Sequence, residues 1–569
     1  MSSLSKFSNL WWAKNSSSFP GSILDWMDRS YVEPHLFWAE LLAYQESVTG
    51  LPIHSSFEDQ YDFYYDCVIR HIESKRAVLK IFKKDSEVES WTYEELHRCV
   101  NYQIKKWKDY SLLPGQLVAI VAPPGFYFLI ALFTSLRLGL QFCYLPTNSP
   151  SLAKKEIVRL IEELKPNLLV TTLEDDTFIS CKYPTLVLNE IRQDEQNYHP
   201  TSYSYPAKEL IQKSLSTYTQ NIDVPLSLDA NTTYLHALRD GLITLNLKPG
   251  MSWASPLSCP IQTKPCTTFM TLLSGATLVE VSDDAINEIP TLLKDKKIDI
   301  IGISDPLERL WSKEPGLPTI QLKCCYKNPL TSNSQRWKSF REQNKIEKIP
   351  TCNLVIDNSR GGITLFSKPS IDNLDFFIRP SLGTPWSLTQ LNGSGDPSLD
   401  GFGIFHLHAG RKSNTKESNF ILAQIGNEWI ISSTVVPCRD GNMFPIKKVE
   451  EVVNAISFVE ACMIYTLPQT GRVASHLFLL LVFINLKKDQ EKDSLAKEIF
   501  FQIENNIGSA FLPSRIEYYP LYPKMEDGTI DRNWCSSQYA EGLLSRKKNM
   551  EIYQILGTLK MLMREKING

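Results

Sequence analysis

Residues 91–150 read WTYEELHRCVNYQIKKWKDYSLLPGQLVAIVAPPGFYFLIALFTSLRLGLQFCYLPTNSP and decide the fold. Their period predicts a strand, a turn, a buried strand, a helix and another buried strand. Leu117–Val121 is a short β-branched apolar run, typical of a parallel strand that is buried on both faces. Phe126–Leu138 continues as an apolar helix, Gly139 stands where a helix C-cap favours glycine, and Phe142–Leu145 is the next strand. This order predicts one βαβ unit of a doubly wound sheet.

The bulk composition is that of an ordinary globular protein, with 43% hydrophobic and 22% charged residues. Because single cores stop growing near ~250–300 residues, a chain of 569 residues predicts several domains. A net charge of −3 gives no support for a nucleic-acid partner. The twelve cysteines include no C-x-x-C pair, which favours a reducing, cytoplasmic location over a zinc site or a secreted disulfide framework.

A membrane span is not favoured by the apolar pattern. The first eighteen residues contain no apolar run of signal-peptide length. Gly125–Leu145 is long enough to span a bilayer, but it carries Arg137 near its middle and is punctuated by glycine. We therefore expect this segment to lie inside a folded α/β domain.

Several passages resemble the adenylate-forming (AMP-binding) superfamily, which includes the acyl-CoA synthetases. The opening stretch has the family's order of TYxEL, PGQxVAI, a helix ending in RLG and a strand closing in proline. KPNLLVTT at 165–172 and LLSGATLVEV at 272–281 resemble later passages of its large domain. FPIKKVEEVVNAISFVEACMIYTLP at 444–468 resembles its small C-terminal domain. Upstream, FWAE at 37–40 and Arg70-His71 are similar to the acetyl-CoA and acetoacetyl-CoA synthetase branch.

The resemblance implies an α/β fold with a large N-terminal domain of doubly wound βα subdomains and a smaller C-terminal α+β domain. We expect an N-terminal cap segment over 1–75 and a large AMP-binding-like domain over 76–425. A small domain over 426–535 and a helical tail over 536–569 would follow.

Adenylation in this family uses a glycine-rich phosphate loop with a lysine, a Thr-Glu turn, a Thr-Gly-Asp strand end and a late Gly-Lys. The phosphate loop should precede the helix around Leu235. However, no glycine occurs between Gly139 and Gly241, and residues 219–238 contain no lysine. Without glycine the backbone cannot wrap a polyphosphate as the family does, so this resemblance predicts that the loop is lost.

The Thr-Glu turn should fall within VIDNSRGGIT at 355–364. Aligning Gly361-Gly362 with the family's paired glycines puts Asn358 and Ser359 where threonine and glutamate would stand. A carboxylate directed at Mg²⁺ would then be missing. We interpret the neighbouring Asp357 as a turn residue.

The remaining two motifs also depart from the family. His406 and His408 occupy the strand end that should supply the ribose-binding aspartate. They alternate on one strand face, but no cysteine or carboxylate stands immediately beside them, so we do not favour a metal site. Thr529 stands where the late lysine would follow glycine, and Lys524 is the candidate substitute.

Our leading hypothesis is a catalytically degenerate acyl-CoA synthetase relative that acts by binding an unknown protein partner or an acyl- or CoA-like molecule. It assigns no catalytic residue, no cofactor and no metal; Asn358, Ser359, Gly361, Gly362, His408 and Thr529 are vestigial nucleotide positions. The alternative is an active ATP-dependent acid–thiol ligase, using Mg²⁺ and CoA, in which Lys213, Lys264 or Lys524 rebuilds the phosphate site. A third interpretation, a cleft that holds a preformed thioester, stays open. No G-x-S-x-G, Walker or H-E-x-x-H motif suggests other chemistry.

Overall fold

The computed structural model describes part of the chain, and all structural statements below refer to that part. The described residues are 23–84, 87–147, 149, 152–172, 178, 182–193, 202–215, 226–255, 263–282, 285, 298–304, 307–308, 322–330, 334–357, 360–367, 370–371, 377–389, 402–408, 415–425, 428–434, 437–439, 442–469, 475–484, 490–520 and 530–542.

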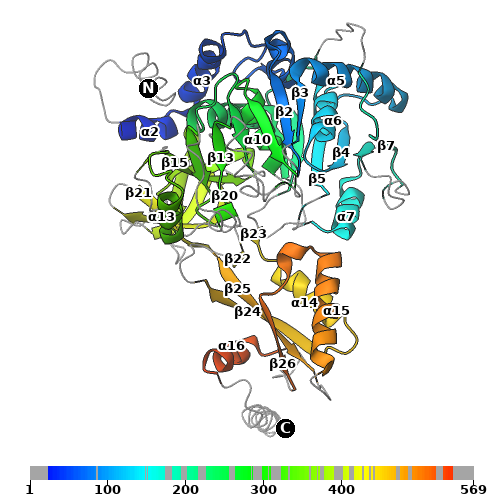
Figure 1. Ribbon diagram of the computed structural model, residues 1–569, viewed down its shortest axis with the longest axis vertical. Coiled ribbons are helices and arrows are strands. Elements are labelled where there is room, and N and C mark those ends of the chain that lie inside the picture. Colours follow the sequence, from blue (N-terminus) through cyan, green and yellow to red (C-terminus); the bar gives the residue numbers. More distant parts are fainter. Residues whose placement is uncertain are drawn as a thin grey trace, which may run out of the picture.

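The first sheet has the strand order β10-β9-β5-β4-β6-β7 (Figure 1). Its strands are β4 (Leu117–Ala122), β5 (Gln141–Pro146), β6 (Leu168–Thr171), β7 (Thr185–Val187), β9 (Leu210–Ser214) and β10 (Leu226–Asp229). The β9-β5-β4-β6-β7 pairs are parallel, and β10 joins antiparallel to β9. Helices α6 (Phe126–Arg137) and α7 (Lys154–Leu164) belong to this unit. The predicted doubly wound βα arrangement is confirmed here.

The second sheet has the order β17-β16-β15-β14-β13-β11-β12-β2-β3. Its strands are β2 (Ala77–Phe82), β3 (Val88–Thr92), β11 (Ser252–Ala254), β12 (Thr277–Val281), β13 (Ile300–Gly302), β14 (Cys324–Lys327), β15 (Thr351–Asp357), β16 (Gly362–Phe366) and β17 (Arg379–Pro380). The strands from β2 to β15 are parallel, and β3, β16 and β17 are antiparallel at the edges.

The main core joins the two sheets through helices α9 (Ala230–Arg239) and α10 (Lys264–Leu272). Phe269 of α10, for example, lies 6.2 Å from the ring of Phe142 on β5. A separate core lies under α13 (Ser334–Gln343), which packs Trp337 and Phe340 against the second sheet. The main core covers one face of the second sheet, and the core under α13 covers the other. Strands buried on both faces are mostly apolar, as the inner strands of this sheet are.

The segment after Trp91 corrects the sequence interpretation, which expected a strand followed directly by a turn. The structure instead has the fifteen-residue helix α5 (Tyr93–Trp107). Its N-cap is a capping box: Thr92 Oγ1 accepts from Glu95 N–H, and the Glu95 carboxylate accepts from Thr92 N–H. The T-x-x-E pattern at Thr92–Glu95 is the recognised sequence signature of such a helix start, so the helix is encoded locally.

The end of α6 confirms the predicted glycine stop. Gly139 has φ +74°, the left-handed conformation that ends many helices. Arg137 is buried at the last turn of α6 and donates to Tyr64 Oη, at 3.1 Å, and to Asn101 Oδ1. The charge that argued against a membrane segment is therefore bonded inside the fold. Among the described residues, we find no helix with the length and apolar content needed to cross a bilayer.

An antiparallel sheet follows the second sheet in the chain. It consists of β18 (Trp386–Thr389), β19 (Phe402–His408), β20 (Thr415–Ile425) and β21 (Glu428–Thr434), paired in that order.

The small C-terminal α+β part has its own core and lies below the large part in Figure 1. Its sheet has the order β24-β25-β26, with α14, α15 and α16 around it. The bounds are β24 (Ala461–Pro468), β25 (His476–Phe483), β26 (Arg515–Tyr519), α14 (Ile446–Asn454), α15 (Gln490–Asn506) and α16 (Arg532–Ala540), with the short pair β22 (Cys438–Arg439) and β23 (Asn442–Met443) preceding them.

The N-terminal segment packs onto the large part. It consists of α2 (Ile23–Val32), α3 (Pro34–Thr49) and α4 (Phe63–Cys67), with β1 (Gln60–Tyr61) pairing β8 (Tyr205–Pro206). Arg70 and Gln45 both donate to the carbonyl of Leu273 just after α10, at 2.7 Å and 3.1 Å. The segment is thereby hydrogen-bonded to the helix that lies between the two sheets.

Candidate functional site

The carboxyl ends of the parallel strands of the second sheet form the candidate site. Open α/β sheets bind ligands beyond these ends. Here the row consists of Ser255 after β11, Ser304 after β13, Asn328 after β14 and Asp357 at the end of β15, all buried. Ser304 Oγ has no hydrogen-bond partner within the described residues. The row therefore offers hydroxyl and amide groups together with a carboxylate.

The β15–β16 turn contains the two glycines singled out from the sequence. Gly361 has φ +75°, a conformation that a side chain would strain. A Cβ at Gly362 would lie 2.3 Å from Asp240 Oδ2, so this position has no room for a side chain. Asn358 and Ser359 lie outside the described residues. Both glycines are thus required by the geometry of the turn.

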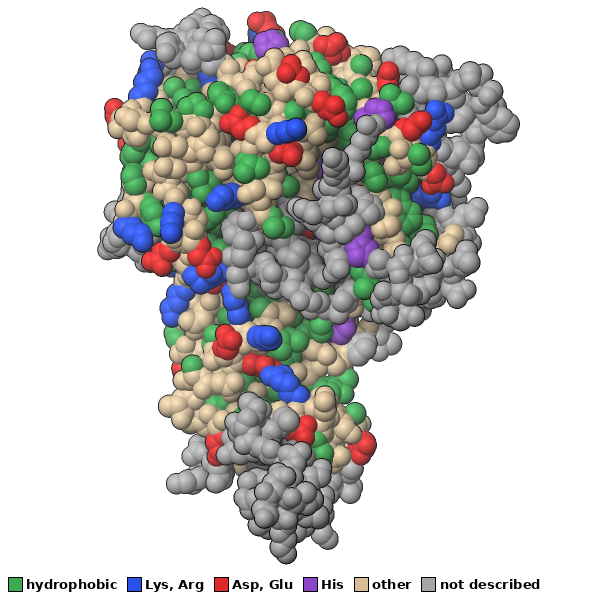
Figure 2. All heavy atoms as spheres, turned by 180° about the vertical axis from the view of Figure 1, so that it is seen from behind, with side chains coloured by type: hydrophobic (Ala, Val, Ile, Leu, Met, Phe, Trp, Pro, Cys, Tyr) green, Lys and Arg blue, Asp and Glu red, His purple; other side chains and the backbone are tan. Residues whose placement is uncertain are grey.

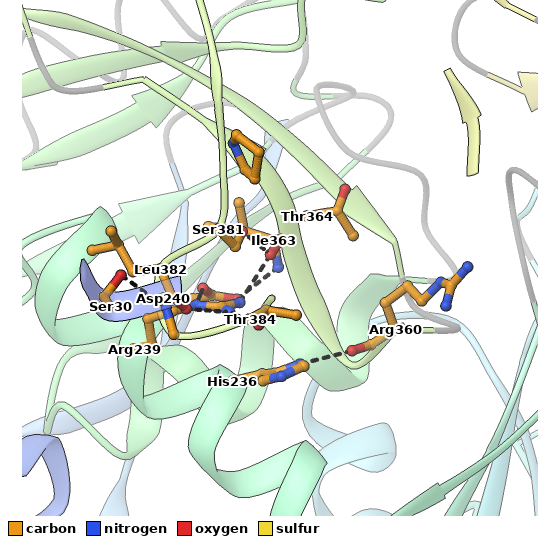
Figure 3. A network of polar contacts seen from close by, with 12 residues as sticks. Ser30, His236, Arg239, Asp240, Arg360, Ile363, Thr364, Ser381, Leu382 and Thr384 are labelled. Carbon is orange, nitrogen blue, oxygen red and sulfur yellow. Dashed lines mark hydrogen bonds and ion pairs between the residues drawn. The ribbon is translucent and has the colours of Figure 1, made fainter. Parts of the chain in front are cut away.

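Arg239 and Asp240, at the end of α9, form hydrogen bonds with the backbone of β16 (Figure 3). Asp240 accepts from Arg239 Nε at 2.6 Å and from the Ile363 N–H at 2.6 Å. Arg239 in turn donates to the Ile363 carbonyl at 2.8 Å and to the Leu382 carbonyl at 3.3 Å. The pair therefore binds both polar groups of one residue, which fixes β16 against α9.

This ion pair is almost completely desolvated, with 1% and 0% of the two side chains exposed. Burial raises the pKa of Asp240, while the Arg239 guanidinium and the bond from Ile363 oppose that shift. Removing one member of a buried, hydrogen-bonded pair leaves an uncompensated charge. The pair is consequently a structural support of the site.

His236, one turn earlier on α9, binds the other side of the turn. Its Nδ1 lies 2.9 Å from the Arg360 carbonyl, and because a carbonyl only accepts, Nδ1 carries the proton. Burial is the largest cause that lowers the pKa of His236 to about 3, and Arg239 lowers it further. His236 is therefore neutral in the fold at physiological pH.

The N-terminal segment supports the same residues through Trp38 of α3. The Trp38 ring lies 5.5 Å from the His236 ring, and the Arg239 guanidinium carbon lies 5.6 Å from the Trp38 ring centre. Figure 3 also shows Ser30 beside this network, and Ser30 Oγ accepts from Gly383 N–H at 3.3 Å.

Arg360 stands one residue after the position of Ser359, and its side chain points away from the Arg239–Asp240 pair in Figure 3. Burial lowers the pKa of its guanidinium, and the nearby Asp357 carboxylate opposes that shift. The turn thus presents a partly buried cation.

The β9–β10 hairpin is the place where the phosphate loop was expected. β9 ends at Ser214 and β10 begins at Leu226, and residues 216–225 between them lie outside the described part. Lys213 lies on β9, next to Cys143 of β5 in the sheet register. Lys264 forms an ion pair with Glu280, with its Nζ 2.6 Å from each carboxylate oxygen. Lys264 therefore already has a carboxylate partner.

His406 and His408 both lie on β19. His406 is buried and pairs in register with Ser387 and Glu417, whereas the side chain of His408 lies outside the described part. Among the described side chains, no group of three or more histidine, cysteine, aspartate or glutamate residues is arranged to hold a metal ion. The described cysteines are all buried.

In the small part, an ion pair anchors the first residue of α16. Arg532 Nη1 donates to Glu450 Oε1 at 2.9 Å, its other nitrogen donates to Oε2, and Glu450 also accepts from Ile464 N–H at 2.7 Å. Lys524 and Thr529 lie outside the described residues. The Glu450–Arg532 anchor therefore fixes the start of α16 against α14 and β24.

Sequence reasoning missed Arg239, Asp240 and His236. A signal existed, because two adjacent charges interrupt an otherwise buried helix, and buried charges require partners. Ile363, the partner of Asp240, is 123 residues away in the chain, and Arg360, the partner of His236, is 124 residues away, so neither could be inferred from local pattern.

Comparison with known proteins shows the fold class. No protein-family model matches the sequence, and no curated protein matches it. Among solved structures, acetoacetyl-CoA synthetase from Streptomyces lividans is similar over 98% of this chain and 98% of its own, with a TM-score of 0.60 and 12% sequence identity. At this identity the likeness shows the fold alone, which is acyl-CoA synthetase-like.

Proposed function

We propose that this chain is an acyl-CoA synthetase-like protein without adenylation activity, which acts by binding an acyl- or CoA-like molecule or a protein partner. The observation that carries the proposal is the β15–β16 turn. Its paired glycines match those of the family and are supported by Asp240, while Asn358 and Ser359 stand where the family has threonine and glutamate. The family's metal-directed glutamate is thus replaced by Ser359, and the nearby Asp357 carboxylate interacts with the Arg360 guanidinium, which favours binding over Mg²⁺-dependent catalysis.

Other departures support the same conclusion. The residues that connect β9 to β10 include neither glycine nor lysine, and Thr529 occupies the late lysine position. Arg360 places a cation beside the turn where a Mg²⁺ site would need a carboxylate. Each of these changes affects a different charged group that the adenylation reaction uses. Loss of that reaction therefore explains all of them together.

The domain division belongs to this proposal: a cap over 1–75, a large domain over 76–425, a small domain over 426–535 and a tail over 536–569. The apolar core that runs from Phe444 to Phe511 supports a separate small domain in this region, although β21 (Glu428–Thr434) pairs with β20 and so belongs with the sheet before it.

The test is thermal unfolding of the full chain with and without Mg-ATP, together with ATP–pyrophosphate exchange over a panel of carboxylic acids. A ligand at a hundred times its Kd stabilises the folded state by about 2.7 kcal/mol. We expect no Mg²⁺-dependent shift at millimolar ATP and no exchange. The matched reference is an active acyl-CoA synthetase under the same conditions.

A Mg²⁺-dependent shift with measurable exchange would contradict the proposal and favour the ligase alternative. The substitutions Lys213→Ala and Lys524→Ala would then identify the lysine that replaces the missing one. A shift with CoA or an acyl-CoA alone would instead identify the ligand class of a binding protein.

A further inference from the structure

The small C-terminal part contacts the first sheet's unit through the N-terminus of α7. Three polar contacts cross this boundary, and we call them the α7 junction. They are Ala153 N–H to the Ile507 carbonyl at 3.1 Å, Lys155 Nζ to Asn506 Oδ1 at 3.0 Å, and Lys448 Nζ to Glu156 Oε1 at 3.2 Å. In Figure 1, α7 lies directly above α14 and α15.

The backbone bond of the α7 junction joins two helices end to end. Ala153 is the N-cap of α7, and Ile507 follows the last residue of α15. The first N–H groups of a helix and its last carbonyls have no partners within the helix, and they carry opposite partial charges. Placing the start of α7 on the end of α15 therefore satisfies a donor and an acceptor and brings helix ends of opposite partial charge together.

The ion pair of the α7 junction is partly shielded from water. Glu156 is 14% exposed and Lys448 is 32% exposed. Although burial raises the pKa of Glu156, bonds from Arg159 and Lys448 outweigh burial and hold this pKa below its usual value. Glu156 thus stays charged at neutral pH and binds cations from its own helix and from α14.

We propose that the α7 junction is an intramolecular latch that holds the small C-terminal part in one orientation against the large part. The two parts have separate apolar cores, so the latch, rather than a shared core, sets their relative position. Figure 2 shows acidic and basic side chains side by side at the waist between them, as a polar junction requires. This inference stands on the contacts alone and does not rest on the proposed function.

Ala153→Pro tests the latch without changing the Lys448–Glu156 ion pair or the Lys155–Asn506 hydrogen bond. Ala153 has φ −67°, which proline adopts, and proline is tolerated at the start of a helix, so the change removes the N–H and leaves α7 formed. Ala153→Gly is the matched control, because it keeps the N–H and is accepted at an N-cap.

The measurement is zero-length carbodiimide cross-linking of the purified full chain, followed by mass spectrometry of the peptides that carry Glu156 and Lys448. We expect this cross-link in the wild type and in Ala153→Gly, and a several-fold lower yield in Ala153→Pro. Absence of the cross-link in the wild type, or equal yields in all three proteins, would overturn the proposal.

A second pair of variants tests the latch without the Ala153→Pro substitution. Lys448→Glu puts a like charge beside Glu156, whereas Lys447→Glu makes the same change of net charge at an exposed neighbour on α14. Small-angle scattering should give a larger radius of gyration for Lys448→Glu than for Lys447→Glu, with cooperative melting in both. An unchanged radius for Lys448→Glu would show that another contact holds the small part.

Discussion

At the scale of single residues, Gly362 connects the Gly361-Gly362 pair of the sequence to a support that lies on another element. Its missing side chain lets the Asp240 carboxylate reach the Ile363 N–H. Pairing the glycines with a known family motif identified the position from sequence. The reason for it lies in a contact with α9, which no local pattern could reveal.

We predict that Gly362→Ala destabilises the fold by about 1–3 kcal/mol. The new Cβ would meet Asp240 Oδ2 at 2.3 Å and force the buried pair to move. Urea unfolding of the full chain measures the change. Gly115→Ala is the control, because Gly115 has φ +83° with open space around it, so only backbone strain of roughly 1 kcal/mol is added there. Equal losses would mean that the Asp240 contact is unimportant.

His236 should make stability depend on pH. Its pKa falls from 6.5 to about 3 on folding, so the unfolded chain binds the extra proton between these values. The contribution of neutral His236 to the free energy of unfolding is therefore present above pH 6.5 and is lost as the pH falls toward 3. We expect His236→Asn, which can keep a donor near the Arg360 carbonyl, to reduce the slope of unfolding free energy by up to about 1.4 kcal/mol per pH unit.

The pH experiment needs two comparisons. His71 has a pKa lowered to about 3 by burial, so part of the slope should survive in His236→Asn. The exposed His35 provides a control for the removal of a histidine, and His35→Gln is measured beside His236→Asn. A wild-type slope in His236→Asn would show that His236 takes up no proton on unfolding.

At the scale of elements, the sequence predicted best those segments in which apolar residues follow one another in a run. The strands β4 and β5 and the helix α6 were predicted because each is an uninterrupted apolar run buried in the core. By contrast, α5 is amphipathic, with nine buried positions spread among charged ones, and its period was overlooked. The strands β7 to β10 are only two to five residues long, which is too short for a period to predict them.

The capping box of α5 gives a prediction at this scale. Thr92→Ala removes the side-chain acceptor for Glu95 N–H and should cost about 1 kcal/mol. Thr92→Ser retains the hydroxyl and should cost much less. Equilibrium unfolding of both variants checks this, and equal losses would assign the effect to the threonine methyl group instead of the cap.

At the scale of the whole molecule, the order of family-like passages predicted a fold that the comparison with a solved structure supports along nearly the entire chain. The family resemblance could not predict how the N-terminal segment is joined to the site. Trp38 was noticed only as part of FWAE, yet it packs against His236 and Arg239. Such joining depends on contacts between distant segments, which composition and period do not encode.

We therefore predict that Trp38→Ala destabilises the whole chain by about 3–5 kcal/mol. Trp38 is 9% exposed, and its loss would leave a cavity beside the buried Arg239–Asp240 pair. Trp38→Phe should retain much of the packing and lose less. Urea unfolding monitored by far-ultraviolet circular dichroism checks both variants, and a wild-type midpoint for Trp38→Ala would show that the N-terminal segment is dispensable.

The Glu450–Arg532 anchor has a consequence for loop grafting. The nine residues 521–529 start after β26, which pairs with β25, and Arg532 holds the segment that follows them. A donor loop of equal length would join the same fixed ends, so its closure entropy would be nearly unchanged. The small part is therefore a ready acceptor for a transplanted loop, including one that carries lysine at position 529.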